Sequence, residues 1–251
     1  INSNEKVIFY FGKCPKKFKY TKIKATRPIP KIQKKINHFS LSDGKFLFHF
    51  VKRSQNYIIG RSISKFILFP KKGINIPYSK YDEKKQLKNY IKFLKKYQKK
   101  VKFDAIGLSF VQTDTVVKFI KSKFPNFAII SKIENIEGLR QLVPISKSSD
   151  GIMIDRGDLR AEIGDEKLFD SIVKISNECK KLSIPLIIGT GNLDSMLIRK
   201  SPTSSEIISL GFSYFLKTGR IMLSEETAIS ENWEAILKWL KKYLNFLNKK
   251  K

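Results

Sequence analysis

The sequence predicts an α/β fold, a (β/α)8 TIM-barrel type that is incomplete in this chain and is preceded by a small β-rich domain. Residues 1–77 are rich in β-branched and aromatic residues broken by short polar stretches, which is typical of strands. Beyond them, five short apolar runs alternate with helical patterns, and this alternation favours a parallel sheet covered by helices. The spacing of about 25–40 residues per unit fits a barrel. The expected domains are therefore 1–77 and 78–251.

The β-rich part contains a recognisable hairpin. The apolar run 46–51 follows the turn Ser42-Asp43-Gly44, and the run 57–63 has the composition of its antiparallel partner. The chain has only two histidines, His38 and His49, and we interpret His49, in an apolar strand, as a structural residue.

The second part is predicted as strands and helices in strict alternation. A helix is expected to begin at Asp82-Glu83, because acidic residues at its start and lysines at its end suit the helix dipole. The elements expected after it, in chain order, are a strand at 104–111, a helix around 116–120, a strand at 127–132, a polar helical segment, a strand at 151–154, a helix at 168–179, a strand at 185–190, a helix at 204–215, a strand at 221–224 and a helix from Trp233 to Leu244.

The net charge of +28 is the most conspicuous feature of the composition. Only 8 of the 50 basic residues are arginine, the side chain preferred for bidentate contacts to phosphates and bases. The lysines are spread from end to end among Ile, Asn and Phe, as an AT-rich coding sequence would produce. We therefore expect non-specific attraction to polyanions and no specific nucleic-acid partner.

Compartment and membrane association can also be predicted. No apolar run approaches the ~18 residues needed to cross a bilayer, and the first residues are too polar for a secretory signal. The two cysteines, Cys14 and Cys179, show no metal or redox spacing. These observations favour a cytoplasmic protein without a membrane partner.

Candidate functional residues follow the predicted strands, since barrel sites are built at the carboxyl ends of strands. Lys132 and Glu134 are two residues apart and would point the same way at the end of one strand. Taken alone, the pair would be interpreted as a surface ion pair. Asp158 follows the next strand, however, and two carboxylates at neighbouring strand ends can share Mg²⁺ or Mn²⁺. A lysine beside such a cation suits phosphoryl transfer.

Six motifs in a fixed order give the chain a family resemblance. They are Lys-Lys-Gly-Ile-Asn-Ile-Pro at 71–77, Leu-Ser-Phe-Val-Gln at 108–112, Ser-Lys-Ile-Glu-Asn at 131–135, Asp-Gly-Ile-Met with Arg-Gly-Asp-Leu at 150–159, the stretch 187–196 and the stretch 221–228. Together they resemble the pyruvate kinase family, clearly over 71–230. The segment 71–77 resembles the return from that family's lid, the B domain. The resemblance implies a barrel with such a lid over a nucleotide.

The resemblance also implies roles for individual residues. Lys132 would stabilise the transferring phosphoryl group, and Glu134 and Asp158 would bind Mg²⁺ or Mn²⁺. The substrate would be held by the backbone around Arg156 and Gly157, by Asp158 through the cation, and by Thr190. Lys72 would face the nucleotide. The implied reaction is the last step of glycolysis, which moves phosphate from phosphoenolpyruvate to ADP. A K⁺ ion is also implied, with its main ligands outside this chain.

The resemblance covers only part of the family's length. In that family three barrel strands precede the lid, and a further domain follows the barrel. We therefore expect a fragment, a chain completed by an N-terminal segment or by a homo-oligomer, or a decayed remnant. Departures within the motifs bear on activity: Asp155 replaces Ala, Arg160 replaces Gly, Ser204 replaces Arg and Glu225 replaces Gly.

Two other classes of function are open on the sequence alone. A related barrel enzyme could carry out metal-assisted enolate chemistry, but the lid segment 71–77 argues against an aldolase or lyase, which needs no cover over a nucleotide. A basic binding protein would bind nucleic acid tightly and would not need Glu134.

Overall fold

The structure is a computed structural model that describes all residues except 33, 43, 71, 81–82 and 250–251. Its contacts divide the described chain into two units. The first comprises Ile1–Val101, Asn135–Glu137 and Gly157–Leu168, and the second comprises Lys102–Glu134, Gly138–Arg156 and Phe169–Lys251. The first unit thus extends beyond residue 77 to Val101, and the domain boundary expected between residues 77 and 78 stays a prediction. No described helix combines the length and apolarity required of a membrane span.

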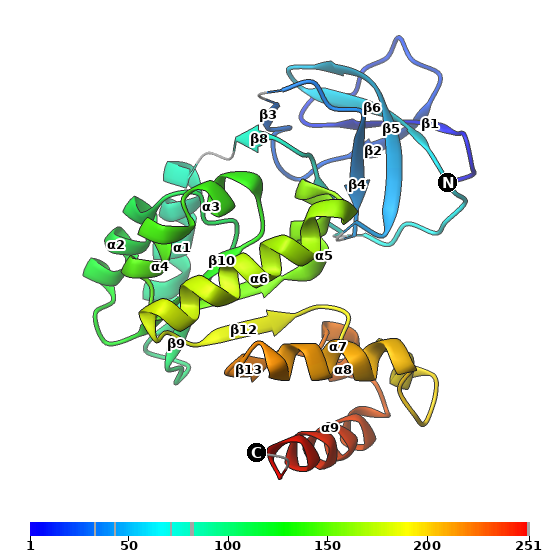
Figure 1. Cartoon of the computed structure of the whole chain (residues 1–251). Coiled ribbons are helices and arrows are strands. Elements are labelled where there is room, and N and C mark those ends of the chain that lie inside the picture. The colour runs from blue at the N-terminus through cyan, green and yellow to red at the C-terminus, as the bar shows by residue number, and fades with distance from the viewer. Residues whose placement is uncertain (33, 43, 71, 81–82, 250–251) are drawn as a thin grey trace. The chain divides into compact units, whose positions relative to one another are not determined.

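The first unit is built on a mixed six-stranded sheet with the strand order β2-β1-β6-β5-β4-β7 (Figure 1). Its strands are β1 (Lys6–Tyr10), β2 (Thr21–Lys24), β4 (His38–Leu41), β5 (Phe46–Ser54), β6 (Tyr57–Ser62) and β7 (Ile74–Asn75). The strands β5 and β6 pair antiparallel, which confirms the predicted hairpin partners. Asp43, in the turn expected before β5, lies outside the described residues. The strands β3 (Lys31–Ile32) and β8 (Ser79–Lys80) form a separate short pair.

Aromatic rings fill the core of this sheet. Phe9 meets Phe39 and Phe48 edge to face, with ring centres 5.7 and 5.4 Å apart, and all three side chains are almost fully buried. Gly60 is required beside them, because a Cβ atom there would lie 2.5 Å from the ring of Phe39. This unit also contains α1 (Glu83–Tyr97), the helix predicted near Asp82, which itself lies outside the described residues.

The second unit contains a parallel sheet with the order β13-β12-β11-β10-β9 in its described part. The strands are β9 (Ala105–Leu108), β10 (Ala128–Ile133), β11 (Gly151–Asp155), β12 (Leu186–Gly189) and β13 (Arg220–Ile221). Neighbours in this sheet are consecutive in the chain, as in the wall of a barrel. The observed α/β architecture is that of a partial (β/α)8 barrel, as predicted.

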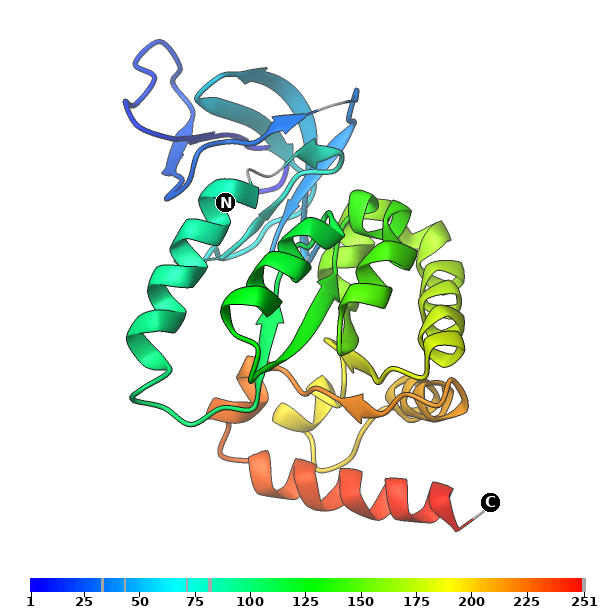
Figure 2. The ribbon, with the colours of Figure 1, turned by 90° about the vertical axis from the view of Figure 1, so that its left-hand side faces the viewer.

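Helices alternate with these strands and bury one face each. They are α2 (Asp114–Lys123), α3 (Ile136–Arg140), α4 (Leu142–Ser148), α5 (Arg156–Ile163), α6 (Asp165–Leu182), α7 (Ser204–Phe215), α8 (Glu225–Ile229) and α9 (Trp233–Asn248), with a 3-10 turn η1 (Asp194–Leu197). Both α2 and α4 pack on β10, and their course beside that strand can be followed in Figure 2. The helix α7 has the predicted bounds, and Thr203 and Glu206 form a capping box at its start.

One predicted strand was partly wrong. The run 221–224 was expected to be extended throughout, but β13 ends at Ile221 and a helix begins at Glu225. The hydroxyl of Ser224 accepts a hydrogen bond from the N–H of Thr227 at 3.3 Å, so Ser224 caps α8. The capping signal therefore outweighed the apolar run at this point.

Candidate active site

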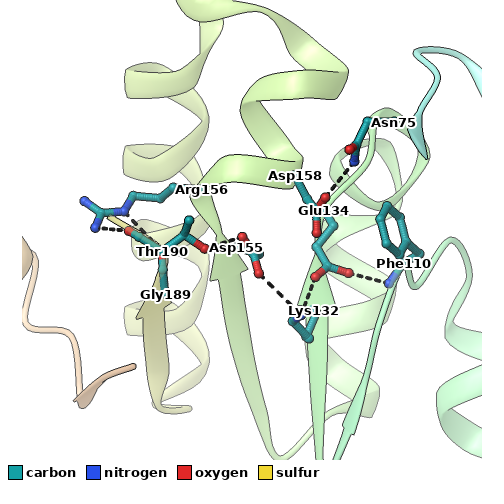
Figure 3. Close-up of polar contacts among 9 residues, drawn as sticks. All are labelled: Asn75, Phe110, Lys132, Glu134, Asp155, Arg156, Asp158, Gly189 and Thr190. Atoms are coloured by element: carbon teal, nitrogen blue, oxygen red, sulfur yellow. Dashed lines mark hydrogen bonds and ion pairs between the residues drawn. The ribbon is translucent and has the colours of Figure 1, made fainter. Parts of the chain in front are cut away.

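Lys132 and Glu134 form an ion pair at the carboxyl end of β10. The Nζ atom of Lys132 lies 2.5 Å from Oε1 of Glu134, and the Glu134 side chain is 0% exposed. The other oxygen of Glu134 accepts a hydrogen bond of 2.6 Å from the backbone N–H of Phe110, which follows β9 (Figure 3). The interpretation as a surface ion pair is therefore wrong, since the carboxylate is buried.

Burial dominates the electrostatics of Glu134. Removal from water raises the pKa of its carboxyl above the usual range, while the Lys132 charge and the Phe110 N–H oppose that rise. The ammonium of Lys132, 2.5 Å away, is the partner that most favours the charged form of this carboxyl. A divalent cation bound at the Glu134 oxygens would add positive charge and so favour the charged form further.

Asp155 adds a second carboxylate to this part of the sheet. It is the last residue of β11, and its Oδ2 lies 3.5 Å from Nζ of Lys132. Its Oδ1 accepts a hydrogen bond from the hydroxyl of Thr190, just beyond β12. Glu134 and Asp155 each offer a carboxylate oxygen within 4.8 Å of the other. Lys132 therefore lies between two acidic groups, and Thr190 is joined to them through Asp155.

Arg156 uses its guanidinium to hold the loop after β12. It donates hydrogen bonds to the carbonyl oxygens of Gly189, at 3.2 Å, and of Thr190. It also donates to the side chains of Asn192, at 2.7 Å, and Ser209, at 2.6 Å. The side chain of Arg156 therefore acts on the loop, and only its backbone remains for the substrate role implied by the resemblance.

The loop held by Arg156 has an unusual backbone. Thr190, Gly191 and Leu193 all have positive φ, of 67°, 67° and 62°. A β-branched residue such as Thr190 rarely adopts this conformation, and such outliers are concentrated at functional sites. Three hydrogen bonds from Arg156, to Gly189, Thr190 and Asn192, hold this strained loop. The bond to Asp155 fixes the Thr190 hydroxyl.

Asp158 lies in the first turn of α5 and belongs to the first unit, with Gly157 beside it. Its side chain is largely buried, and its Oδ1 accepts a hydrogen bond of 2.6 Å from Nδ2 of Asn75 on β7. Sequence reasoning identified Asp158 but missed Asn75, whose only signal was its place in the motif 71–77.

Glu162 and Lys72 are two further charged residues of the first unit. Glu162, one turn after Asp158 on α5, is 4% exposed and was missed from the sequence. Burial raises its pKa to about 8, although the backbone N–H groups of Ile136 and Tyr78 oppose the rise. Lys72 is exposed in the segment between β6 and β7, and its nucleotide-binding role stays a prediction.

The donors present fit a hard divalent cation. Carboxylate oxygens are the ligands that Mg²⁺ and Mn²⁺ prefer, and one or two of them suffice because water and substrate fill the remaining positions. Glu134 and Asp158 offer such oxygens from buried side chains, and no described residue beside them supplies the thiolate or imidazole expected of a zinc site. Asp155 is a third carboxylate of the same chemistry.

Parallel strands with a lysine and carboxylates at their carboxyl ends define this chain as part of a (β/α)-barrel protein with a charged site at the strand ends. The family model described as pyruvate kinase, barrel domain, matches residues 14–234. The chain belongs to the pyruvate kinase family.

Individual relatives agree with this assignment. Pyruvate kinase from Eimeria tenella is 32% identical over 211 residues, which cover 80% of this chain and 38% of that protein. Pyruvate kinase from Thermococcus litoralis is 32% identical over 212 residues, covering 82% and 44%. A structure titled Cryptosporidium parvum pyruvate kinase in complex with ADP shares the fold, with a TM-score of 0.79 and 23% identity over 96% of this chain and 50% of that one. The chain thus spans half or less of the length of these proteins.

Proposed function

We propose that this chain supplies the lysine and metal-binding part of a pyruvate kinase active site, which transfers a phosphoryl group from phosphoenolpyruvate to ADP in the last step of glycolysis. The observation that carries the proposal is the buried pair of Lys132 and Glu134, 2.5 Å apart at the end of a barrel strand. Family membership supports the reaction, and the relative solved with ADP supports the nucleotide.

In the proposed reaction an oxygen of the β-phosphate of ADP attacks the phosphorus of phosphoenolpyruvate, and the bond from phosphorus to the enol oxygen breaks. Negative charge is spread over the three equatorial oxygens of the transferring group, so catalysis is mainly positioning and charge neutralisation. The ammonium of Lys132 is the group that neutralises this charge. The released enolpyruvate is then protonated at carbon to give pyruvate.

Glu134 and Asp158 are the proposed ligands of Mg²⁺ or Mn²⁺, which when bound supplies further positive charge to the phosphoryl and carboxylate oxygens. Glu134 holds Lys132 by the ion pair, and Phe110 holds Glu134. The backbone around Arg156 and Gly157 is proposed to hold the substrate carboxylate. The side chain of Arg156 supports this task by fixing the loop that carries Thr190.

Lys72 is proposed to face the nucleotide, and K⁺ is proposed as a second cation whose main ligands lie outside this chain. The two cysteines, Cys14 and Cys179, are free thiols, which is in keeping with a cytoplasmic enzyme. As the alternative, the chain has the pyruvate kinase fold but acts only with a partner chain, a homo-oligomer or an N-terminal segment, or has lost activity. The edge strands β9 and β13 of the described sheet favour the partner form of this alternative, because unpaired strand edges seek a neighbour.

The test is pyruvate formation from phosphoenolpyruvate and ADP with Mg²⁺, followed in a coupled assay on the purified chain. We expect Lys132→Met to lower turnover roughly 100- to 1,000-fold, as for removal of one group that stabilises transition-state charge. The matched control is Lys147→Met, since Lys147 is an exposed lysine on α4 and should leave turnover unchanged.

The same assay is repeated after adding the segment of a relative that precedes the lid. If turnover occurs only in the mixture and is lost in Lys132→Met, the chain needs a partner, as in the alternative. If well-folded protein shows no Lys132-dependent turnover in either form, the proposal that the chain contributes to catalysis is wrong.

A further inference from the structure

The amide of Asn75 is in contact with the carboxylate of Asp158 although the two residues are 83 positions apart. The Nδ2 atom of Asn75 lies 2.6 Å from Oδ1 of Asp158, and the two side chains are 2% and 9% exposed. Both residues belong to the first unit. An ionised carboxylate only accepts hydrogen bonds, so the nitrogen of the amide faces Asp158 and the amide oxygen is left for a different donor.

The remaining oxygen of Asn75 is a buried acceptor. Its Oδ1 is enclosed and has no hydrogen-bond partner among the described residues. A buried amide oxygen is rarely left without a donor, and such an exception needs an explanation. A bound cation of the Mg²⁺ type keeps several water molecules, and each of these can donate a hydrogen bond to a neighbouring oxygen.

The backbone gives Asn75 little freedom to turn elsewhere. β7 pairs with β4, with Asn75 opposite Ser40, and the carbonyl of Gly73 accepts a hydrogen bond of 3.1 Å from the N–H of Ser42. Ile76, the next residue, is 1% exposed. The side chain of Asn75 is therefore presented to α5 by an edge strand that β4 holds along one side.

We propose that Asn75 is a positioning residue of the divalent-cation site: its amide nitrogen orients Asp158, and its amide oxygen accepts a hydrogen bond from water bound to the cation. The inference rests on the proposed function, in which Asp158 is a cation ligand. The hydrogen bond from Asn75 uses one of about four acceptor positions of the Asp158 carboxylate, so it is compatible with metal binding by Asp158. Partners that orient a ligand in this way typically change metal affinity 10- to 100-fold.

Mn²⁺ binding to the full chain without substrate tests the proposal, measured as the loss of the electron paramagnetic resonance signal of free Mn²⁺. Asn75→Ala is expected to weaken Mn²⁺ binding roughly 10- to 100-fold. Glu134→Gln, which removes a proposed ligand, should weaken it at least as much. Ser40→Ala is the matched control, since it changes the buried polar residue opposite Asn75 and should leave the affinity within about twofold of the wild type.

Asn75→Asp keeps the size of the side chain and covers the case in which the alanine variant does not fold. It places a second carboxylate against Asp158, so without Mn²⁺ its melting temperature should lie below that of the wild type. Added Mn²⁺ should raise that temperature by more than it raises the temperature of the wild type, because the cation neutralises the new repulsion. If the role of Asn75 is purely structural, Asn75→Asp should lower the melting temperature by the same amount with and without Mn²⁺.

The outcomes separate this inference from the function on which it rests. If Asn75→Ala binds Mn²⁺ as the wild type does while Glu134→Gln does not, the inference is overturned and the proposed function stands. If the wild type itself shows no binding that depends on Glu134, the proposed cation site fails and the role of Asn75 fails with it.

Discussion

Asp155 brings a negative charge to the place where a substrate phosphate would meet Lys132. Its Oδ2 is 3.5 Å from the lysine ammonium, and Thr190 holds its other oxygen. A phosphoryl group that pairs with Lys132 would have to share this ammonium with Asp155, as well as with Glu134. Because like charges at such short range repel, Asp155 should weaken the binding of an anionic substrate.

Removing that charge is expected to strengthen substrate binding. Asp155→Ala and Asp155→Asn should both bind phosphoenolpyruvate several-fold more tightly, measured with labelled substrate by equilibrium dialysis in the presence of Mg²⁺. Asparagine can still accept the hydrogen bond from Thr190, so the asparagine variant separates charge from hydrogen bonding. Weaker binding in both variants would instead show that the Asp155 carboxylate contributes to the cation site.

The sequence identifies site residues only where spacing or a strand end marks them. Lys132 and Glu134 are two apart after an apolar run, and the structure places them in direct contact. The contact between Asn75 and Asp158 joins residues 83 positions apart, and no periodicity in a single sequence reports such a pairing. The hydrogen bonds of the Arg156 side chain could not be predicted either, because two of its four acceptors are backbone carbonyls of a loop whose conformation depends on the fold.

At the scale of elements, two acidic residues one turn apart on α5 hold neighbouring segments of the first unit. Asp158 accepts a hydrogen bond from Asn75 on β7, and Glu162 accepts hydrogen bonds from the backbone N–H groups of Tyr78 and Ile136. Tyr78 has a φ of 56°, so the segment after β7 bends sharply where Glu162 receives it. The helix therefore fixes the end of the segment 71–77 that the resemblance assigns to the lid.

Glu162 should make the stability of the folded protein depend on pH. Its pKa is about 8 in the folded protein against 4.5 ordinarily, so between these values the folded state binds more protons than the unfolded state. The free energy of unfolding should therefore fall as pH rises from about 4.5 to about 8, by a few kcal/mol in all. Glu162→Gln keeps an acceptor for the N–H groups and should remove most of this fall.

The measurement is urea unfolding at pH 5.5 and pH 8.5, with Glu166→Gln as the control, since Glu166 is an exposed acidic residue at the start of α6. The control should show the pH dependence of the wild type. An equal dependence in Glu162→Gln would mean that Glu162 is charged at neutral pH and that its partners compensate for burial.

Most elements could be predicted from the sequence because their periodicity is strong. The predicted helix 204–215 and the alternation of five strands with helices match the structure. The ends of short strands were less predictable, since β13 stops where Ser224 caps a helix and β9 is shorter than its apolar run. The grouping of α5 with the β-rich unit could not be predicted, because it depends on buried polar contacts rather than on the order of elements.

At the scale of the whole molecule, the net charge of +28 attracts anions, whereas the acidic side chains of the proposed site attract a cation. A strongly basic surface attracts any polyanion, whereas the proposed site residues Lys132, Glu134 and Asp158 would bind a cation and a phosphate ester. The general attraction depends on many lysines distributed over the chain, and the chemistry depends on a few fixed groups. The two properties should therefore respond to different changes in the protein and in the solvent.

Salt and a single substitution should separate the two properties. Binding to a duplex DNA of arbitrary sequence, measured by fluorescence anisotropy, should weaken roughly 100-fold or more between 50 and 200 mM salt, because the affinity comes from the release of counterions. It should be equal for unrelated DNA sequences and unchanged in Glu134→Gln, since removing one buried carboxylate hardly alters the total charge. The same variant should lose Mg²⁺-dependent turnover. Tight DNA binding that prefers one sequence and persists at high salt would instead favour a basic binding protein, because salt-independent affinity requires direct contacts to bases.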